Sequence, residues 1–432
     1  MFHFLFFLVM KIIYLIGIRY NYHTHLNFQG VQMIENIVER FSKAASMQRW
    51  NDHIRPVEFT ELDKQAHKMV IAYVIARFEE DRMGPHSVDW LALIEGGIFE
   101  FLHRTVLTDI KPPVFHRMMK EKGEELNKHV FKELENDMEG LNHGFQERFK
   151  NYYLKSSNTL ERRILRAAHY LATQWEFKII YHTAPFIHGI EQTKENIENQ
   201  IEDHYDLIGV QKILLGKKSF GFIDRCGQLR FQKRWAHIPR IPETSVLGHM
   251  FIVAATSYLC TMEMNVEACP KRFYNNFYAG LFHDLPEVLT KDIISPVKDS
   301  VEGLKEIIKD YEEFQMNEEL LPLLPRPWHT DMKYFSESEF ENKIQDNQQV
   351  LLGLSFKNIN RDYNEDEFSP LDGELLKAVD RLAAFIEAKM SINHGIKSDE
   401  LKEASNNIYD EYARETISGI DFGRIFNYFH NL

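Results

Sequence analysis

Apolar residues recur every three or four positions along most of the chain, which is the spacing of amphipathic α-helices. The pattern is clean from Met33 onward, and residues 33–41 are the first helix that it predicts. Strict alternation of apolar and polar residues, which is typical of half-buried strands, is rare. Its longest example is residues 218–223 with 229–231, where we expect a short hairpin or loop between two halves of the chain. The pattern therefore predicts an all-α fold.

Residues 1–18 depart from this pattern because almost all of them are apolar. One interpretation is a signal anchor that holds the protein at a membrane. Against it, Lys11 lies inside the apolar run, no small-residue cleavage site follows, and the run is near the lower length limit for a spanning helix. We favour the alternative, in which translation begins at Met33 and residues 1–32 are an extension outside the folded protein.

Length, charge and cysteine content narrow the class of protein. The chain has 432 residues, enough for two or three domains, and its 44% hydrophobic content predicts a globular core. A formal net charge of −13 argues against a protein that coats nucleic acid, although a nucleotide substrate needs only a local positive cluster. The three cysteines are too few for a disulfide framework. We therefore expect a cytoplasmic protein without a nucleic-acid partner.

Four side chains of metal-ligand type, His249, His283, Asp284 and Asp380, lie in segments that are otherwise apolar and helical. A charged carboxylate on an apolar helix face is costly unless it is paired or bound to a metal. Two imidazoles and two carboxylates suit one divalent ion such as Mn, Co, Fe, Ni, Zn or Mg. Adjacent helical side chains diverge, so His283 and Asp284 share an ion only at a helix end or a kink, which Pro286 permits.

These four residues belong to a longer motif. Arg234 and Trp235 precede the first His, and residues 283–298 are H-D-L-P-E-V-L-T-K-D-I-I-S-P-V-K. The pattern resembles the HD-domain metal-dependent phosphohydrolases, most closely the YfbR-like 5'-deoxynucleotidase group, over roughly the second half of the chain. One position departs from that family, which usually has an acidic residue immediately before the first His. This chain has Gly248 there, which leaves open what supports that His.

The resemblance implies a nucleotide substrate and a 5'-nucleotidase that releases phosphate from (deoxy)nucleoside 5'-monophosphates. In that family the acidic residue three after the doublet works with the metal in proton transfer, and the later Asp contacts the sugar. These roles fall on Glu287 and Asp292. Arg234 can offer a planar fork to phosphate oxygens, and Trp235 can flank the sugar or base. The alternatives are a (deoxy)nucleoside triphosphohydrolase, a non-catalytic nucleotide sensor, or a scaffold with a structural site.

The first half of the chain carries a weaker version of the same pattern. We therefore predict two tandem HD-type helical domains at residues 33–210 and 211–432, paired as a pseudo-dimer, and leave homo-oligomerisation open. The matched positions are Arg49 and Trp50 with Arg234 and Trp235, His67 with His249, residues 97–99 with 280–282, Asp109 and Pro113 with Asp292 and Pro296, and His169 with Asp380.

The first copy lacks the chemistry of the second. Its doublet position holds Glu100 and Phe101, and a Phe side chain cannot bind a metal. The acidic position that follows becomes Arg104 in one of two alignments. His67, Glu100 and His169 would make at most a poor three-ligand site. We expect a degenerate domain retained for packing, for dimer-like pairing or for regulation.

Residues 299–372 make the second copy longer than the first. Their charge pattern and the Pro-rich run at residues 321–328 predict two amphipathic helices joined by a turn. We consider a lid over the metal site and a surface elaboration as the two roles for this insertion.

Overall fold

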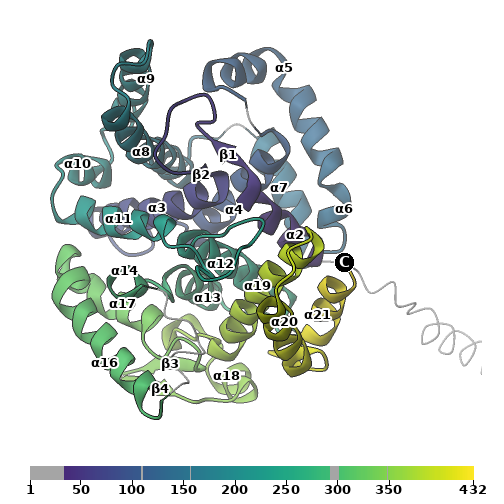
Figure 1. Ribbon diagram of the computed structural model, residues 1–432. Coiled ribbons are helices and arrows are strands. Elements are labelled where there is room, and N and C mark those ends of the chain that lie inside the picture. The colour runs from purple at the N-terminus through teal and green to yellow at the C-terminus, as the bar shows by residue number, and fades with distance from the viewer. Residues whose placement is uncertain (1–33, 109, 156, 292–300, 348) are drawn as a thin grey trace, which may run out of the picture.

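Helices make up nearly all of the regular structure in the computed structural model, which describes residues 34–108, 110–155, 157–291, 301–347 and 349–432 (Figure 1). The predicted all-α class is confirmed. Predictions on residues 1–32, Asp109, Asp292 and Pro296 lie outside the described residues. Among the described residues the strands form three antiparallel pairs: β1 (Gln48–Arg49) with β2 (Phe59–Thr60), β3 (Lys343–Asp346) with β4 (Gln349–Leu352), and β5 (Thr416–Ile417) with β6 (Ile420–Asp421).

The first half is built around one long helix, α3, and lies in the upper part of Figure 1. Its helices are α2 (Glu35–Lys43), η1 (Ala44–Ser46), α3 (Glu61–Met83), α4 (Trp90–Val106), α5 (Pro112–Glu133), α6 (Glu135–Met138), η2 (Asn142–Gly144), α7 (Phe145–Leu154), α8 (Leu160–Thr183), α9 (Ile190–Glu202) and α10 (Ile208–Leu214).

The second half is built around helices α12, α13 and α19 and fills the lower part of Figure 1. Its helices are α11 (Lys218–Gln228), η3 (Leu229–Phe231), α12 (Val246–Glu263), α13 (Pro270–Phe282), α14 (Glu287–Thr290), α16 (Leu304–Gln315), the π-helical turn η4 (Met316–Leu320), η5 (Leu321–Leu323), η6 (Arg326–Trp328), α17 (His329–Ser336), α18 (Phe356–Asp362), η7 (Asp366–Phe368), α19 (Gly373–Asn393), α20 (Asp399–Tyr412) and α21 (Phe422–Asn431).

Both halves contribute to one continuous hydrophobic core. The ring of Phe251 on α12 lies 6.4 Å from that of Phe41 and 5.3 Å from that of Phe101, which both belong to the first half. Tyr73 on α3 and Tyr278 on α13 are 4.8 Å apart between ring centroids. Because these aromatic contacts join the halves, separating them would expose a large apolar surface to water.

Helix α12 is the centre of this core. It is the one described helix that is long and apolar enough to cross a membrane, but 94% of it is buried inside the protein. A side chain on Gly280 of α13 would place its Cβ 2.7 Å from the Cα of Ala254 on α12. The missing side chain therefore allows the close approach of α12, which carries His249, and α13, which ends immediately before the His283–Asp284 doublet.

Residues 218–231 and the insertion test two of the predictions about local structure. The predicted hairpin at residues 218–231 is wrong, because this segment forms α11 and η3, whose buried face includes Phe222, Ile223 and Cys226 at helical spacing. In the insertion, α16 and α17 flank the Pro-rich turn as predicted. That turn is anchored by the fully buried Trp328, and the β3–β4 hairpin that follows was not predicted.

Candidate metal centre

The four predicted metal ligands come together from three elements. His249 is the fourth residue of α12, and Asp380 lies in the middle of α19. Helix α13 ends at Phe282, so His283 and Asp284 occupy the turn that leads into α14. The doublet therefore sits at a helix end, as the divergence of adjacent helical side chains requires.

The ligand atoms are spaced like the ligands of a single ion. His249 Nε2 lies 2.9 Å from Asp380 Oδ1 and 3.7 Å from Asp284 Oδ2. His283 Nε2 lies 3.2 Å from Asp284 Oδ2 and 3.9 Å from Asp380 Oδ1. With bonds of about 2.1 Å, neighbouring ligands are about 3.0 Å apart on an octahedral ion and about 3.4 Å apart on a tetrahedral one. The observed spacings run from 2.9 to 3.9 Å, and the donor atoms of His249, His283 and Asp284 all lie within 4.8 Å of one another, so these three residues fit a divalent cation and Asp380 lies beside them.

His283 is oriented for ligation through Nε2. Its Nδ1 lies 2.9 Å from the carbonyl oxygen of Gly280. A carbonyl only accepts, so Nδ1 carries the proton and Nε2 is left as the basic nitrogen. That nitrogen is buried and has no hydrogen-bond partner among the described residues, even though Asp284 Oδ2 is close. A buried nitrogen without a partner is costly unless it binds something, and a metal ion would satisfy it.

The electrostatics of the centre favour ionised carboxylates. Burial raises the pKa of Asp284 and Asp380, but the neighbouring imidazoles and Arg234 hold both below their usual range. Burial lowers the pKa of His283, but the Asp284 and Asp380 carboxylates raise it to about 9. Both carboxylates therefore stay ionised, and without a metal the His283 imidazole holds a proton that a bound divalent cation would displace from Nε2.

Arg234 and Trp235 lie beside the ligands because Glu387 holds both of them. Arg234 Nη1 is 3.6 Å from Asp284 Oδ2, and its Nε donates to Glu387 Oε2 at 3.2 Å. Trp235 Nε1 donates to the same oxygen at 2.9 Å, and Thr244 Oγ1 donates to the other at 2.7 Å. Burial raises the pKa of Glu387, but Arg234 and its other cationic neighbours lower it to about 2.

Sequence reasoning missed Glu387. It lies on α19 two turns after Asp380, so both carboxylates belong to one face of the helix. The available signal was a carboxylate between Ile386 and Ala388 in a segment that is otherwise apolar. Its position behind Arg234 makes it a positioning residue for the predicted phosphate fork.

Glu287 opens the short helix α14 directly after the doublet, and its side chain is buried. Its backbone N–H donates to the carbonyl oxygen of Asp284 at 3.1 Å. Gln232 Nε2 donates to the Glu287 carbonyl oxygen at 3.0 Å. These bonds fix the backbone of Glu287 next to the ligands, while the predicted contact of Asp292 with a sugar lies outside the described residues.

The insertion reaches the metal centre. The ring of Phe340 lies 6.3 Å from the ring of His283 between centroids. Burial raises the pKa of the neighbouring Glu339, whose carboxyl also interacts with His283 and Asp284. The segment that follows α17 therefore lies against the site, and its movement as a lid stays a prediction.

The first half repeats the contacts of Arg234 and Trp235. Arg49 Nε and Trp50 Nε1 both donate to Glu176 Oε2, at 3.0 and 2.8 Å. Trp50 and Trp235 also share an uncommon backbone conformation, with φ of 56° and 58°. A bulky residue adopts positive φ only where its surroundings enforce it, so the two halves impose the same local geometry.

The predicted match of His67 with His249 is wrong. His67 Nε2 contacts the carbonyl oxygen of Ile223 at 2.9 Å, and its ring packs on Trp175 at 5.1 Å. Burial and Arg230 lower the pKa of His67 to about 3. His67 therefore lies in a neutral, buried contact between α3 and α11, whereas Glu100 contacts Lys68 and His169 contacts Lys64. Among the described residues these three do not group as metal ligands.

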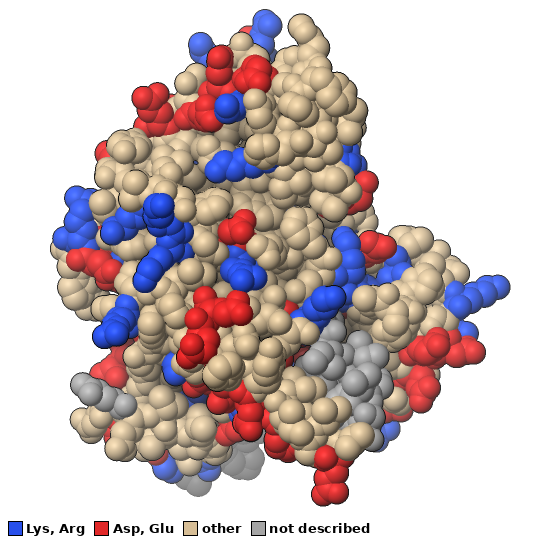
Figure 2. Space-filling view, turned by 60° about the vertical axis from the view of Figure 1, so that its left-hand side comes forward, with Lys and Arg blue, Asp and Glu red and all other residues tan. Residues whose placement is uncertain are grey.

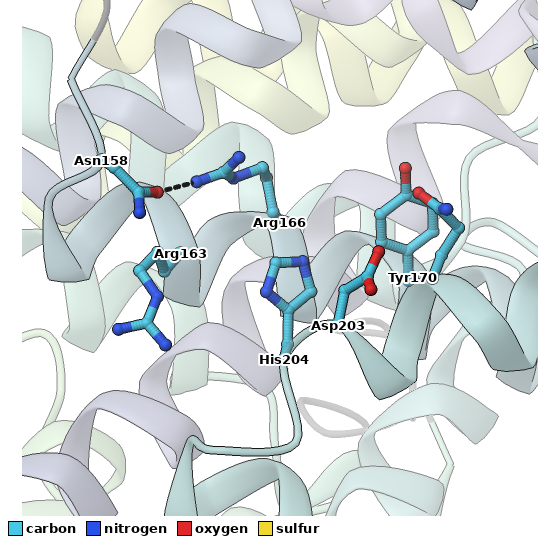
Figure 3. Close-up of a pocket in the computed structure, with 7 residues that line it drawn as sticks. Asn158, Arg163, Arg166, Tyr170, Asp203 and His204 are labelled. Atoms are coloured by element: carbon cyan, nitrogen blue, oxygen red, sulfur yellow. Dashed lines mark hydrogen bonds between the residues drawn. The ribbon is translucent and has the colours of Figure 1, made fainter.

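A surface pocket of about 330 Å³ lies elsewhere, between α8 and the end of α9 (Figure 3). It contains none of the predicted site residues. The pocket is lined by Asn158, Arg163, Arg166, Tyr170, Gln200, Asp203 and His204.

On the face seen in Figure 2, basic and acidic side chains are interspersed, and the described residues form no continuous basic band there.

Comparison with known proteins adds one finding. Residues 226–409 match the family model described as HD domain. No curated protein and no solved structure matches the chain. The matched segment includes Arg234, the four ligands and Glu287. This part of the chain therefore resembles an HD domain, a kind of domain that typically depends on a divalent metal, and the cluster of His249, His283 and Asp284 fits such an ion.

Proposed function

We propose that the protein is a divalent-metal-dependent phosphohydrolase that releases phosphate from (deoxy)nucleoside 5'-monophosphates. The observation that carries the proposal is the position of Arg234, whose guanidinium lies 3.6 Å from the ligand Asp284. A phosphate with one oxygen at the metal would place its other oxygens within reach of this fork. A purely structural metal site has no use for a guanidinium at its edge.

The residues of the chain have separate roles in this reaction. A bound divalent ion supplies Lewis acidity for the phosphoryl group and for an attacking water. Arg234 binds and orients the phosphate, and Glu387 holds Arg234 in place. Glu287, anchored beside Asp284, accepts the proton of the water. The Asp284 and Asp380 side chains are 19% and 18% exposed, whereas both imidazoles are buried, so substrate approaches from the carboxylate side.

The experiment is a phosphate-release screen over nucleoside mono- and triphosphates with Mn, Co, Zn and Mg. We expect release from monophosphates, and none from the Asp380→Asn variant, because that change removes a ligand charge. Release from triphosphates alone would favour the triphosphohydrolase. Nucleotide binding without release under any metal would favour a sensor.

We also infer that the first half is a diverged copy of the HD domain. The pairing of Gln48 with Thr60 and the bridge of Lys233 with Ser245 recur at a constant offset, since 233 − 48 and 245 − 60 are both 185. Both Thr60 and Ser245 then cap a long central helix, by accepting the N–H of the residue three positions on. The shared contacts of Arg49 and Arg234 with a glutamate support the same inference.

A further inference from the structure

The first half carries a charged cluster at the place where the second half carries its metal centre. Lys64 and His249 are each the fourth residue of a helix that begins with a hydroxyl N-cap. Lys64 Nζ lies 2.5 Å from His169 Nδ1, just as His249 Nε2 lies 2.9 Å from Asp380 Oδ1. Lys64 therefore takes the position of the first metal ligand.

Two glycines establish the remaining equivalences. A Cβ on Gly97 would meet the side chain of Met69, and a Cβ on Gly280 would meet the backbone of Ala254. Met69 and Ala254 each lie five residues after Lys64 and His249, so the two helix crossings correspond. The resulting pairs are Glu100 with His283, Phe101 with Asp284 and Arg104 with Glu287.

The substitutions invert the charge of the site. The second half assembles carboxylates that need a cation, whereas cations outnumber carboxylates by five to three in the cluster at the equivalent place, where Arg230 of the second half joins four cations of the first. Six of the groups are linked by ion pairs through Glu61 and Glu176, and the Lys68–Glu100 pair interacts electrostatically with Lys64. The cations are Arg49, Lys64, Lys68, Arg104 and Arg230, and the carboxylates are Glu61, Glu100 and Glu176.

The excess positive charge lowers the pKa of groups inside the cluster. Burial lowers the pKa of Lys64 well below its usual range, and Arg49, Lys68 and Arg104 lower it further against the pull of Glu61. Burial and the same lysines also lower the pKa of His169, which therefore contributes no positive charge of its own. An anion bound here would relieve the repulsion between buried cations.

We propose that this first-half cluster binds the phosphate group of a small anion without a metal ion. A phosphate monoester carries a charge of about −1.5 to −2 at neutral pH, and its binding would favour the protonated form of Lys64, which brings the excess of the cluster to two positive charges. Arg104 supplies a planar fork, and the side chains of Arg104 and Glu100 are each 25% exposed, so the cluster is reached from solvent. The proposal rests on the inferred equivalence of the two halves but not on hydrolysis.

The experiment measures binding of inorganic phosphate and of a nucleoside monophosphate by calorimetry, with full-length protein stripped of metal by a chelator. We expect one equivalent of phosphate to bind, and the Arg104→Gln variant to bind about tenfold or more weakly. Arg104→Lys keeps the charge and should retain part of the affinity. Tighter binding of the nucleotide than of phosphate would identify a nucleotide as the source of the group.

One control locates the anion. Arg163→Gln removes a partly exposed guanidinium from the separate pocket of Figure 3 and should leave metal-free phosphate binding unchanged. Loss of binding in Arg163→Gln, equal binding by wild type and Arg104→Gln, or no metal-free binding at all would each overturn the proposal. Hydrolysis by the metal-loaded enzyme is scored separately, so the two proposals fail independently.

Discussion

Asp63 of the first half lies directly against Gly248 of the second. A Cβ built on Gly248 would lie 2.8 Å from Asp63 Oδ1, and Ser245 Oγ donates to the same oxygen at 2.5 Å. The two residues occupy equivalent positions, three after the cap of their helices. The absence of an acidic residue before His249 thus has a packing reason, because the first half fills that space with its own carboxylate.

We expect Gly248→Ala to destabilise the protein by about 1–3 kcal/mol, since the new methyl group would overpack Asp63 and Leu62. Urea unfolding measures the change. The matched control is Gly221→Ala on α11, where the nearest atom, on Leu323, lies at 3.4 Å. That change should be neutral or stabilising by about 0.5–1 kcal/mol, and equal destabilisation of both variants would contradict the packing argument.

Metal content should depend on the second half alone. We expect His283→Ala to purify with less divalent metal than wild type, because the buried Nε2 is lost from the ligand set. His67→Ala removes another buried imidazole, but one bonded to the Ile223 carbonyl. Its metal content should equal that of wild type, and elemental analysis of the folded variants decides between the two outcomes.

Glu287→Gln tests proton transfer. We expect kcat to fall by about 10²–10⁴-fold while metal content and nucleotide affinity stay unchanged, because the variant keeps the shape but not the basicity of the side chain. The measurement is steady-state phosphate release from nucleoside monophosphates. Equal rates in variant and wild type would remove Glu287 from the mechanism.

Glu387→Gln tests the positioning of Arg234. Loss of the carboxylate charge should loosen the phosphate fork and lower kcat/KM by about 10–100-fold, mainly by raising KM. Glu176→Gln makes the same change to the Arg49 and Trp50 contacts of the first half. Turnover by this control should stay within a few-fold of wild type, and matching losses in both would point to a general folding defect.

Acid should weaken the first-half cluster through Glu61. Burial raises the pKa of Glu61, but Arg49, Lys64 and Arg104 lower it to about 2. A folded-state pKa below the unfolded value means that the stabilisation is complete above about pH 4.5 and is lost as the pH falls towards 2. The contribution is up to about 3 kcal/mol.

Urea unfolding at a series of pH values measures this effect. In Glu61→Gln the fall in stability between about pH 5 and pH 3 should be shallower than in wild type. Glu58→Gln, which changes an exposed carboxylate in the same segment, should keep the wild-type slope. A Glu61→Gln profile parallel to wild type would contradict the prediction.

The residue types and their spacing were enough to predict the helical class and the candidate metal ligands of the second half. Helical periodicity indicated an all-α chain, and the cost of burying His283, Asp284 and Asp380 in apolar helices indicated a metal site. The prediction of the helical class succeeds because it depends on a periodicity that each segment carries by itself, and the metal site stays a prediction. The hairpin predicted at residues 218–231 failed because the alternation was short, and a buried helical face uses the same apolar residues.

Only the tertiary structure decided which side chains of the first half contact which side chains of the second. Sequence comparison paired His67 with His249 by residue type and by their spacing to the doublet position, whereas the proposed equivalence of the helix caps puts Lys64 there, one turn earlier. A shift of three residues keeps a helix on nearly the same face, so periodicity alone cannot detect it. The contact of Arg234 with Glu387 joins residues 153 positions apart in the sequence. The contact of Asp63 with Gly248 joins residues 185 positions apart. Such contacts follow from how helices cross, which no local pattern encodes.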